Sequence, residues 1–327
     1  MKCINRIEIA ILALMTGMLM LTGCKKNDIP IEYDEYDLSE NYKIDMEATP
    51  KEMPLFAEDI CATNTDIIDS STINSASIYS AGVFDVNNKK TLYSYLIHTQ
   101  VNPASLTKLM TVLLVLDNCS LDEMVTVPDV TIYEEGVQKF GLTEGDQISV
   151  GNLLYLTVVY SANDAALALA KYVGGSEEGF AVMMNDKAKA LGATRSNFVN
   201  PHGLSHDDHY TTAYDLYLIF NACVKYEVFV NMINTKEYDI TYTTAAGESV
   251  TKTIKTTDKF INGDYEQPYS VEIIGGKTGS TVAAGKCLIV YAKDASGNPY
   301  IGIIMGANDE QALYTTMRTL LNETVGN

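Results

Sequence analysis

Apolar and polar positions divide the chain after about residue 53 into strands, then helices, then strands again. Residues 78–86 and 91–97 have the composition of strands, and the turn residues Asn87 to Lys90 between them predict a hairpin. The segment after Ser105 is apolar nearly all round, which is typical of a helix buried inside a domain. We expect further helices at 149–160, 164–173, 176–191 and 212–223, the last opened by a Thr212 cap with Asp215 three residues on.

The carboxy-terminal third changes to strand patterns. Residues 238–244 and 249–256 alternate around a turn at Ala246 and Gly247. Three more strands are expected at 273–282, 287–293 and 300–307, followed by a helix at 309–323. This order predicts an α+β fold: the first hairpin joins the last three strands in a five-stranded antiparallel sheet, and the helices form a separate lobe.

The amino terminus predicts a targeting segment. Lys2 and Arg6 precede an apolar core at 9–21 that is shorter than the roughly 20 residues of a membrane-spanning helix. The core ends at Leu21-Thr22-Gly23-Cys24, which resembles a bacterial lipobox; the alternative is an ordinary signal peptide with an incidental cysteine. We expect a lipoprotein signal peptide over 1–23, lipidation at Cys24, an acidic tether over 24–52 and a catalytic domain over 53–327. The protein would then work outside the cytoplasmic membrane, held to it by two acyl chains.

The charge of the chain limits its possible partners, and its cysteines raise the question of disulfides. The formal net charge is −19 and the chain has only three arginines, which argues against nucleic acid as a partner. Apart from Cys3 and Cys24, the chain has four widely spaced cysteines: Cys61, Cys119, Cys223 and Cys287. Outside the cell they can form disulfides, or they can be small buried hydrophobic residues, and spacing does not decide between the two.

The first chemical motif places a hydroxyl and an amine one helical turn apart. In Ser105-Leu106-Thr107-Lys108 the two groups share a face if a helix begins there, and a desolvated lysine can take the proton of the serine. The helix amino terminus would also favour negative charge on the serine oxygen. A second copy, Ser249-Val250-Thr251-Lys252, lies in a predicted strand, where positions three apart face opposite sides.

Two further motifs supply polar groups. Ser161-Ala162-Asn163 lies between two predicted buried helices, where a hydroxyl can relay a proton and an amide can bind a peptide. The same spacing in Ser39-Glu40-Asn41 and Ser296-Gly297-Asn298 lies in the tether and in a turn. Lys277-Thr278-Gly279 lies on a predicted strand, where Gly279 permits close approach of a substrate backbone. The N–H groups of Ser280 and Ser105 can form an oxyanion hole.

These three motifs occur in the order shared by penicillin-binding proteins and serine β-lactamases. The longer strings PASLTKLMT, SANDAALALA, NFVNPHGL, YTTAYDL and GGKTGST resemble the low-molecular-weight D-alanyl-D-alanine carboxypeptidase family from about residue 53 onward. The resemblance implies the β-lactamase/penicilloyl-transferase fold, stem peptides of peptidoglycan as substrate, β-lactams as inhibitors, and no cofactor or metal.

The resemblance also implies roles for the residues. Ser105 would be acylated, Lys108 would be the base and Ser161 would pass the proton on. The substrate-binding residues would be Asn163, which positions the peptide, Lys277 and Thr278, which hold its terminal carboxylate, and the backbone at Gly279 and Ser280. Family members commonly have Gly where this chain has Ala162, and many carry a further β-rich domain and a membrane helix that we do not expect here. The scarcity of arginine leaves a guanidinium clamp unassigned, and carboxypeptidase and endopeptidase activities both stay open.

Other functions compete with this one. No string like E-x-x-L-N, which would supply the deacylating carboxylate of a class A β-lactamase, lies between Asn163 and Lys277. A β-lactam sensor without turnover usually joins a transmembrane segment, and the sequence suggests none. His202, His206 and His209 could suggest a metal site, but their spacing in a loop with Pro and Gly offers no regular face. We expect them to support the fold.

Overall fold

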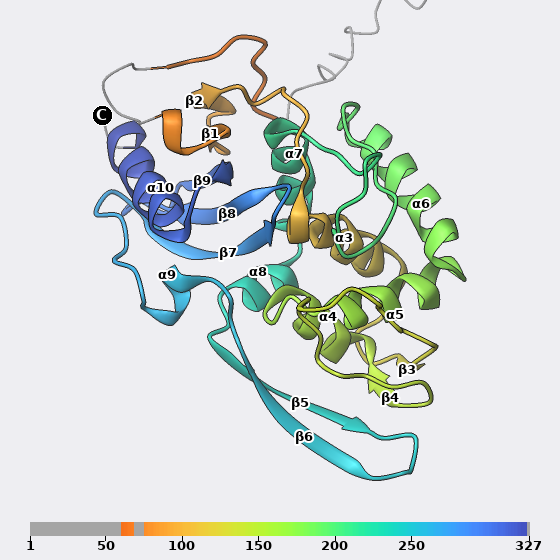
Figure 1. Cartoon of the computed structure of the whole chain (residues 1–327). Coiled ribbons are helices and arrows are strands. Elements are labelled where there is room, and N and C mark those ends of the chain that lie inside the picture. Colours follow the sequence, from red (N-terminus) through yellow and green to blue (C-terminus); the bar gives the residue numbers. More distant parts are fainter. Residues whose placement is uncertain (1–59, 69–74, 326–327) are drawn as a thin grey trace, which may run out of the picture. The chain divides into compact units, whose positions relative to one another are not determined.

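The first hairpin and the last three strands form one antiparallel sheet, as the sequence pattern predicts. The computed structural model describes residues 60–68 and 75–325. The strands of the larger sheet lie in the order β2-β1-β9-β8-β7. Their bounds are β1 Ser80–Asp85, β2 Lys90–Tyr95, β7 Glu272–Thr281, β8 Gly285–Lys293 and β9 Pro299–Ala307. Ser80 of β1 lies opposite Met305 of β9, so the beginning and the end of the domain meet inside the sheet (Figure 1).

Both faces of this sheet are buried. On one face Ile289 and Ile303 belong to the core shared with the helical lobe. On the other face Leu288 and Val290 pack with the helix α10, Glu310–Thr324. Because successive side chains of a strand point to opposite faces, strands covered on both sides must be apolar at nearly every position. The continuous apolar runs of β8 and β9 follow from this arrangement.

The helices form a lobe beside strand β7. Its centre is α3, Lys108–Asn118, which contacts four other helices and is buried over its first eight residues. The other helices are α4 Val150–Val158, α5 Asn163–Gly174, α6 Glu177–Ala190, α7 Ala213–Cys223 and α8 Glu227–Ile233. The Thr212 hydroxyl accepts a hydrogen bond from the N–H of Asp215, which confirms the predicted helix cap.

A second, four-stranded sheet lies below the lobe. Strands β5 Glu237–Thr243 and β6 Ser249–Lys255 form the predicted hairpin, which extends away from the body of the domain (Figure 1). The short strands β3 Met124–Thr126 and β4 Gln147–Ser149 complete the order β3-β4-β5-β6. These two strands, the helix α8 and the short helix α9 Lys259–Asn262 were not expected from the sequence. They are too short to establish a periodic pattern.

The helix that carries the first motif begins later than predicted. A 3₁₀ turn, η2 Ala104–Thr107, precedes α3, so Ser105 lies in the turn and Lys108 begins the α-helix. A further 3₁₀ turn, η1, spans Ser75–Ser77.

Two further findings concern the thiols and the possible membrane-spanning helices of the described residues. The thiols of Cys61, Cys119, Cys223 and Cys287 are all free, and three of the four residues are buried, as for small hydrophobic side chains. In the described part of the chain no single helix is long and apolar enough to cross a membrane. Of the described helices, only α7 and α8 taken together, with a bend of 115° between them, have the length and composition of a membrane-spanning segment. Cys24, the signal peptide and the tether lie outside the described residues.

Candidate active site

The turn before α3 holds Ser105 against the edge strand β7. Ala104 has a left-handed backbone with φ of 48°, which is uncommon for a residue with a side chain and is typical of functional turns. The Asn102 side chain accepts a hydrogen bond from the Ala104 N–H, and the Ala104 carbonyl accepts one from the Thr107 hydroxyl. The backbone of Ser105 is therefore fixed from both sides.

Lys108 lies beneath Ser105 with its amine in contact with three oxygen atoms. Its Nζ is 3.0 Å from Ser105 Oγ, 2.6 Å from Asn163 Oδ1 and 2.6 Å from the His202 carbonyl oxygen. The side chain is buried, and this burial, together with the nearby Lys277, holds the pKa of Lys108 well below its usual range, although Asp164 opposes the shift. In its neutral form this amine would have two hydrogens for Asn163 and His202 and a lone pair for the proton of Ser105.

A second buried lysine, Lys277 of β7, contacts Ser161. Its Nζ donates to Ser161 Oγ at 2.8 Å and to the Thr278 carbonyl oxygen at 2.9 Å. Burial lowers the pKa of Lys277 to about 7, against the opposing charge of Asp258. Ser161 itself has a left-handed backbone with φ of 63°. Within the described residues Ser161 thus hydrogen-bonds Lys277 rather than Lys108, and Asn163 is the neighbour that hydrogen-bonds Lys108.

The strand residues after Lys277 border the cavity beside Ser105. Thr278, Gly279 and Ser280 line a cavity of about 380 Å³ together with Ser105 and Ser161. The Thr278 hydroxyl lies 2.7 Å from that of Thr257. A Cβ on Gly279 would lie 3.1 Å from the Ser105 backbone nitrogen. The missing side chain of Gly279 therefore makes room for the turn that carries Ser105, a reason that differs from the expected approach of a substrate backbone.

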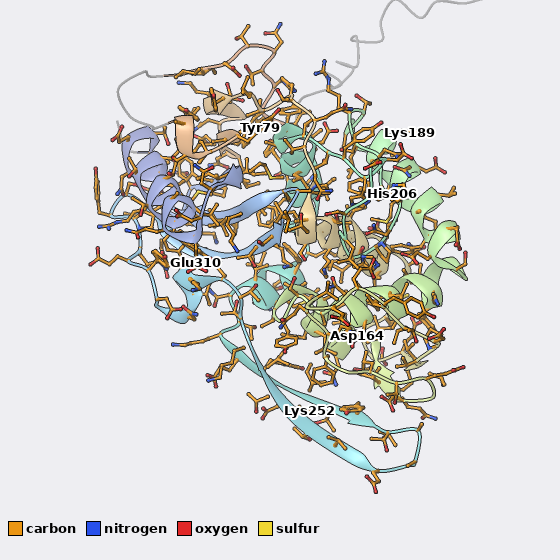
Figure 2. The ribbon with its side chains drawn as sticks, in the orientation of Figure 1. Tyr79, Asp164, Lys189, His206, Lys252 and Glu310 are labelled. Atoms are coloured by element: carbon orange, nitrogen blue, oxygen red, sulfur yellow. The ribbon has the colours of Figure 1, made fainter. Side chains whose placement is uncertain are left out.

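A loop that sequence reasoning overlooked lines part of the cavity. Gln138 lines the cavity, and its carbonyl accepts a hydrogen bond from the N–H of Asn163. The loop is held by the Asp164 carboxylate, which accepts from the N–H groups of Phe140, Gly141 and Leu142. Figure 2 shows Asp164 within the helical lobe. An aspartate next to a predicted active-site residue, at the start of a helix, was the only signal for this role.

The loop that contains His202, His206 and His209 contacts Lys108 and the turn before it. His209 is buried, with Nε2 2.8 Å from the Thr107 hydroxyl and Nδ1 accepting from the N–H of Val199. Burial lowers the pKa of His209 to about 3. Gly203 has φ of 88°, and a Cβ there would lie 1.8 Å from the Ala104 carbonyl oxygen. No three His, Cys, Asp or Glu side chains in the described ranges are placed to hold a metal ion.

The duplicate motifs lie away from this site. Ser249 and Lys252 are both exposed on β6, and the Lys252 ammonium lies 4.8 Å from the centre of the Phe140 ring, outside the cavity (Figure 2). Ser296 and Asn298 lie in the turn between β8 and β9, where both N–H groups donate to Asp294. The third copy, from Ser39 to Asn41, lies outside the described residues.

Comparison with known proteins finds relatives described as D-alanyl-D-alanine carboxypeptidases, a D-alanyl-D-alanine endopeptidase and a DD-transpeptidase. A family model described as D-alanyl-D-alanine carboxypeptidase matches residues 68–309. D-alanyl-D-alanine carboxypeptidase DacF of Bacillus subtilis is 31% identical over 236 residues, which cover 70% of this chain and 57% of the relative. A D-alanyl-D-alanine endopeptidase of Escherichia coli is 33% identical over 215 residues, covering 64% of this chain and 66% of the relative. The crystal structure of the Streptomyces K15 DD-transpeptidase superposes with a TM-score of 0.70 at 27% identity, covering 78% of this chain and 98% of that one. The chain thus spans little more than half the length of DacF.

Proposed function

Because the chain belongs to the D-alanyl-D-alanine carboxypeptidase family of serine peptidases, we propose that it removes the terminal D-alanine of peptidoglycan stem peptides through an acyl-enzyme on Ser105. One observation carries the proposal: the Lys108 amine lies 3.0 Å from Ser105 Oγ while two further acceptors occupy its hydrogens. Such an amine is placed to accept the proton of a serine nucleophile, the requirement for covalent catalysis by a hydroxyl group.

The first half of the reaction forms the acyl-enzyme. Ser105 Oγ attacks the carbonyl carbon of the scissile bond as its proton moves to Lys108. The backbone N–H groups of Ser105 and Ser280 bind the resulting oxyanion. The leaving amine of D-alanine takes the hydroxyl proton of Ser161, which receives one from Lys277 Nζ at 2.8 Å.

The second half returns the enzyme to its starting state. Water attacks the acyl carbon, and its proton replaces the one that Lys277 released through Ser161. Lys108 then returns its proton to Ser105 Oγ as the carboxylic acid product leaves. The same acylation with a β-lactam, whose leaving amine stays attached, accounts for the expected binding of penicillins.

A comparison of four variants tests this division of roles. Removing one member of a catalytic unit typically costs about 10⁴- to 10⁶-fold in turnover, and removing both costs little more, so the losses in Ser105→Ala and Lys108→Ala should not add. Ser105→Ala should abolish the covalent penicillin adduct, whereas Lys277→Ala should only slow its formation by about 10²- to 10³-fold. Mass spectrometry over time measures adduct formation in all four variants, and release of D-alanine from a peptide ending in D-Ala-D-Ala measures whether the losses in turnover add. An adduct in Ser105→Ala, or additive losses in the double variant, would refute the mechanism.

Endopeptidase activity is the second candidate, because the chain is also similar to the Escherichia coli D-alanyl-D-alanine endopeptidase. The two activities differ in the leaving group, which is free D-alanine in one case and a cross-linked peptide in the other. Incubation with an uncross-linked pentapeptide and with a cross-linked dimer separates them. Release of D-alanine from the pentapeptide without cleavage of the dimer supports the carboxypeptidase, and the reverse result supports the endopeptidase.

We also propose that lipid on Cys24 anchors the protein outside the cytoplasmic membrane. The position of Cys24 directly after the apolar core and Leu21-Thr22-Gly23 supports this proposal. Cys24→Ser should release the protein from membranes or leave its precursor uncleaved. A correctly processed Cys24→Ser protein that still fractionates with membranes would contradict it.

A further inference from the structure

Two lysines line the cavity beside Ser105, and a third lies behind its wall. Lys259 and Lys286 line the cavity, whereas Lys277 of β7 is buried. The Nζ of Lys277 already donates to Ser161 Oγ and to the Thr278 carbonyl oxygen. Lys277 is only 1% exposed and is not among the residues that line the cavity. The charge that meets a carboxylate in the cavity therefore comes from another residue.

Lys259 is already neutralised by its own neighbours. Its Nζ lies 2.6 Å from the Glu310 carboxylate at the start of α10 and 4.0 Å from that of Asp264. Figure 2 shows Glu310 beside the larger sheet. An anionic ligand at Lys259 would have to displace Glu310 or accept its repulsion, because like charges at short range repel.

Lys286 lies on β8, the strand that pairs with β7. In the ladder of β7 and β8 it lies opposite Ser280, one position beyond the pair of Gly279 and Cys287. Directly opposite residues of an antiparallel pair lie on the same face with Cβ atoms about 5 Å apart, and diagonal neighbours such as Thr278 remain within reach of a long side chain. Lys286 is half-buried, and no ion pair or side-chain hydrogen bond involves it among the described residues. Its charge is therefore free for a ligand.

We propose that Lys286, together with the hydroxyl groups of Thr278 and Ser280, forms the subsite that binds the terminal carboxylate of the substrate. The inference rests on the proposed peptidase function. The leaving D-alanine carries its carboxylate on the carbon next to the scissile nitrogen, so this anion must lie within a few ångströms of Ser105. Strand pairing places Lys286 opposite Ser280, the residue after Gly279, and a Cβ on Gly279 would lie 3.1 Å from the Ser105 backbone nitrogen. Lys286 thereby takes the role that the sequence resemblance gave to Lys277, and it replaces the guanidinium that the chain lacks.

The test pairs a substrate change with a residue change. Acylation rates are measured with benzylpenicillin and with its methyl ester, which lacks the anion, in the wild type, Lys286→Gln and Lys293→Gln. Lys293 is the matched control: it lies on the same strand, with its Nζ 5.8 Å from the Tyr291 ring and away from the cavity. Lys286→Gln should slow acylation by the acid roughly 10- to 100-fold, the scale of one hydrogen bond to a charged group, and leave the ester rate unchanged. Lys293→Gln should change neither rate.

The outcomes separate this inference from the proposed function. Equal losses for acid and ester in Lys286→Gln, or no loss for either, would refute the carboxylate subsite. Hydrolysis of a peptide ending in D-Ala-D-Ala is followed in parallel with the wild type. A wild type that is acylated by penicillin but does not cleave this peptide would refute the carboxypeptidase proposal, and the penicillin pair would still decide the role of Lys286.

Discussion

Gly203→Ala should disable the active site from a residue that touches no substrate. Gly203 has φ of 88°, and a Cβ at this position would lie only 1.8 Å from the Ala104 carbonyl oxygen. The two atoms would have to separate by about 1.5 Å to reach ordinary van der Waals contact. Either the loop or the turn must move, and both hold the site: the neighbouring His202 carbonyl binds Lys108, and Ala104 precedes Ser105.

Gly203→Ala should lose both stability and acylation rate. A left-handed alanine costs about 1 kcal/mol in backbone energy, and crowding a packed interior costs typically ~1–3 kcal/mol more. Stability should therefore fall by roughly 2–4 kcal/mol. A displacement of about 1 Å between reacting groups costs on the order of 10²-fold in rate, so acylation of Ser105 should slow at least that much.

Gly247→Ala provides a matched control for this variant. Gly247 has nearly the same φ, 85°, but it lies at the tip of the β5–β6 hairpin, where a Cβ would meet no atom within 4 Å. This variant should lose about 1 kcal/mol of stability and keep its acylation rate. Urea unfolding and the rate of penicillin adduct formation measure both effects. The reasoning fails if Gly203→Ala is acylated as fast as Gly247→Ala and is no less stable.

Two further variants test the duplicate motif and the buried histidine. Ser249→Ala should leave penicillin labelling unchanged, because Ser249 is exposed on β6; loss of labelling in a folded variant would mean that Ser249 is the nucleophile. The pKa of His209 falls from 6.5 to about 3 on folding, so its neutral form stabilises the protein above pH 6.5, and this contribution is lost as the pH falls from 6.5 toward 3. Since one titrating group contributes about 1.4 kcal/mol per pH unit, the wild type should lose ~2–3 kcal/mol more than His209→Gln between pH 6.5 and 4.5. Equal slopes in the wild type and His209→Gln would contradict the assignment.

The sequence predicted most of the fold because the large elements have strong periodic patterns. The joining of the first hairpin to the last three strands in one antiparallel sheet and the buried helix after Ser105 followed from apolar runs and turn residues, whereas the order of the strands within the sheet did not. The strands β3 and β4 were missed because three residues cannot establish an alternation. Their partner is the β5–β6 hairpin, far along the chain, so local patterns contain no sign of the second sheet.

The site was predictable in its side chains but not in its backbone contacts. The motifs identified Ser105, Lys108, Ser161 and Lys277, which the structure brings together. The partner of Ser161 was not predictable, because the choice between two lysines depends on tertiary geometry. The His202 carbonyl, which accepts from Lys108, was also missed. A carbonyl group is present in every residue, so the sequence cannot show which one is used.

The order of strands in the larger sheet determines when its strands can pair as the chain is synthesised. A chain that emerges amino terminus first delivers β1 and Ser105 early, whereas β7, β8 and β9 come last. Until β9 arrives, β1 lacks the neighbour with which it pairs along its whole length, and Ser105 lacks the strand that carries Lys277 and Gly279. Pairing between segments so distant in sequence is slow, because closing the long loop costs entropy before any contact is gained. Ser105 therefore lies in an incomplete site until β7, β8 and β9 have joined the sheet.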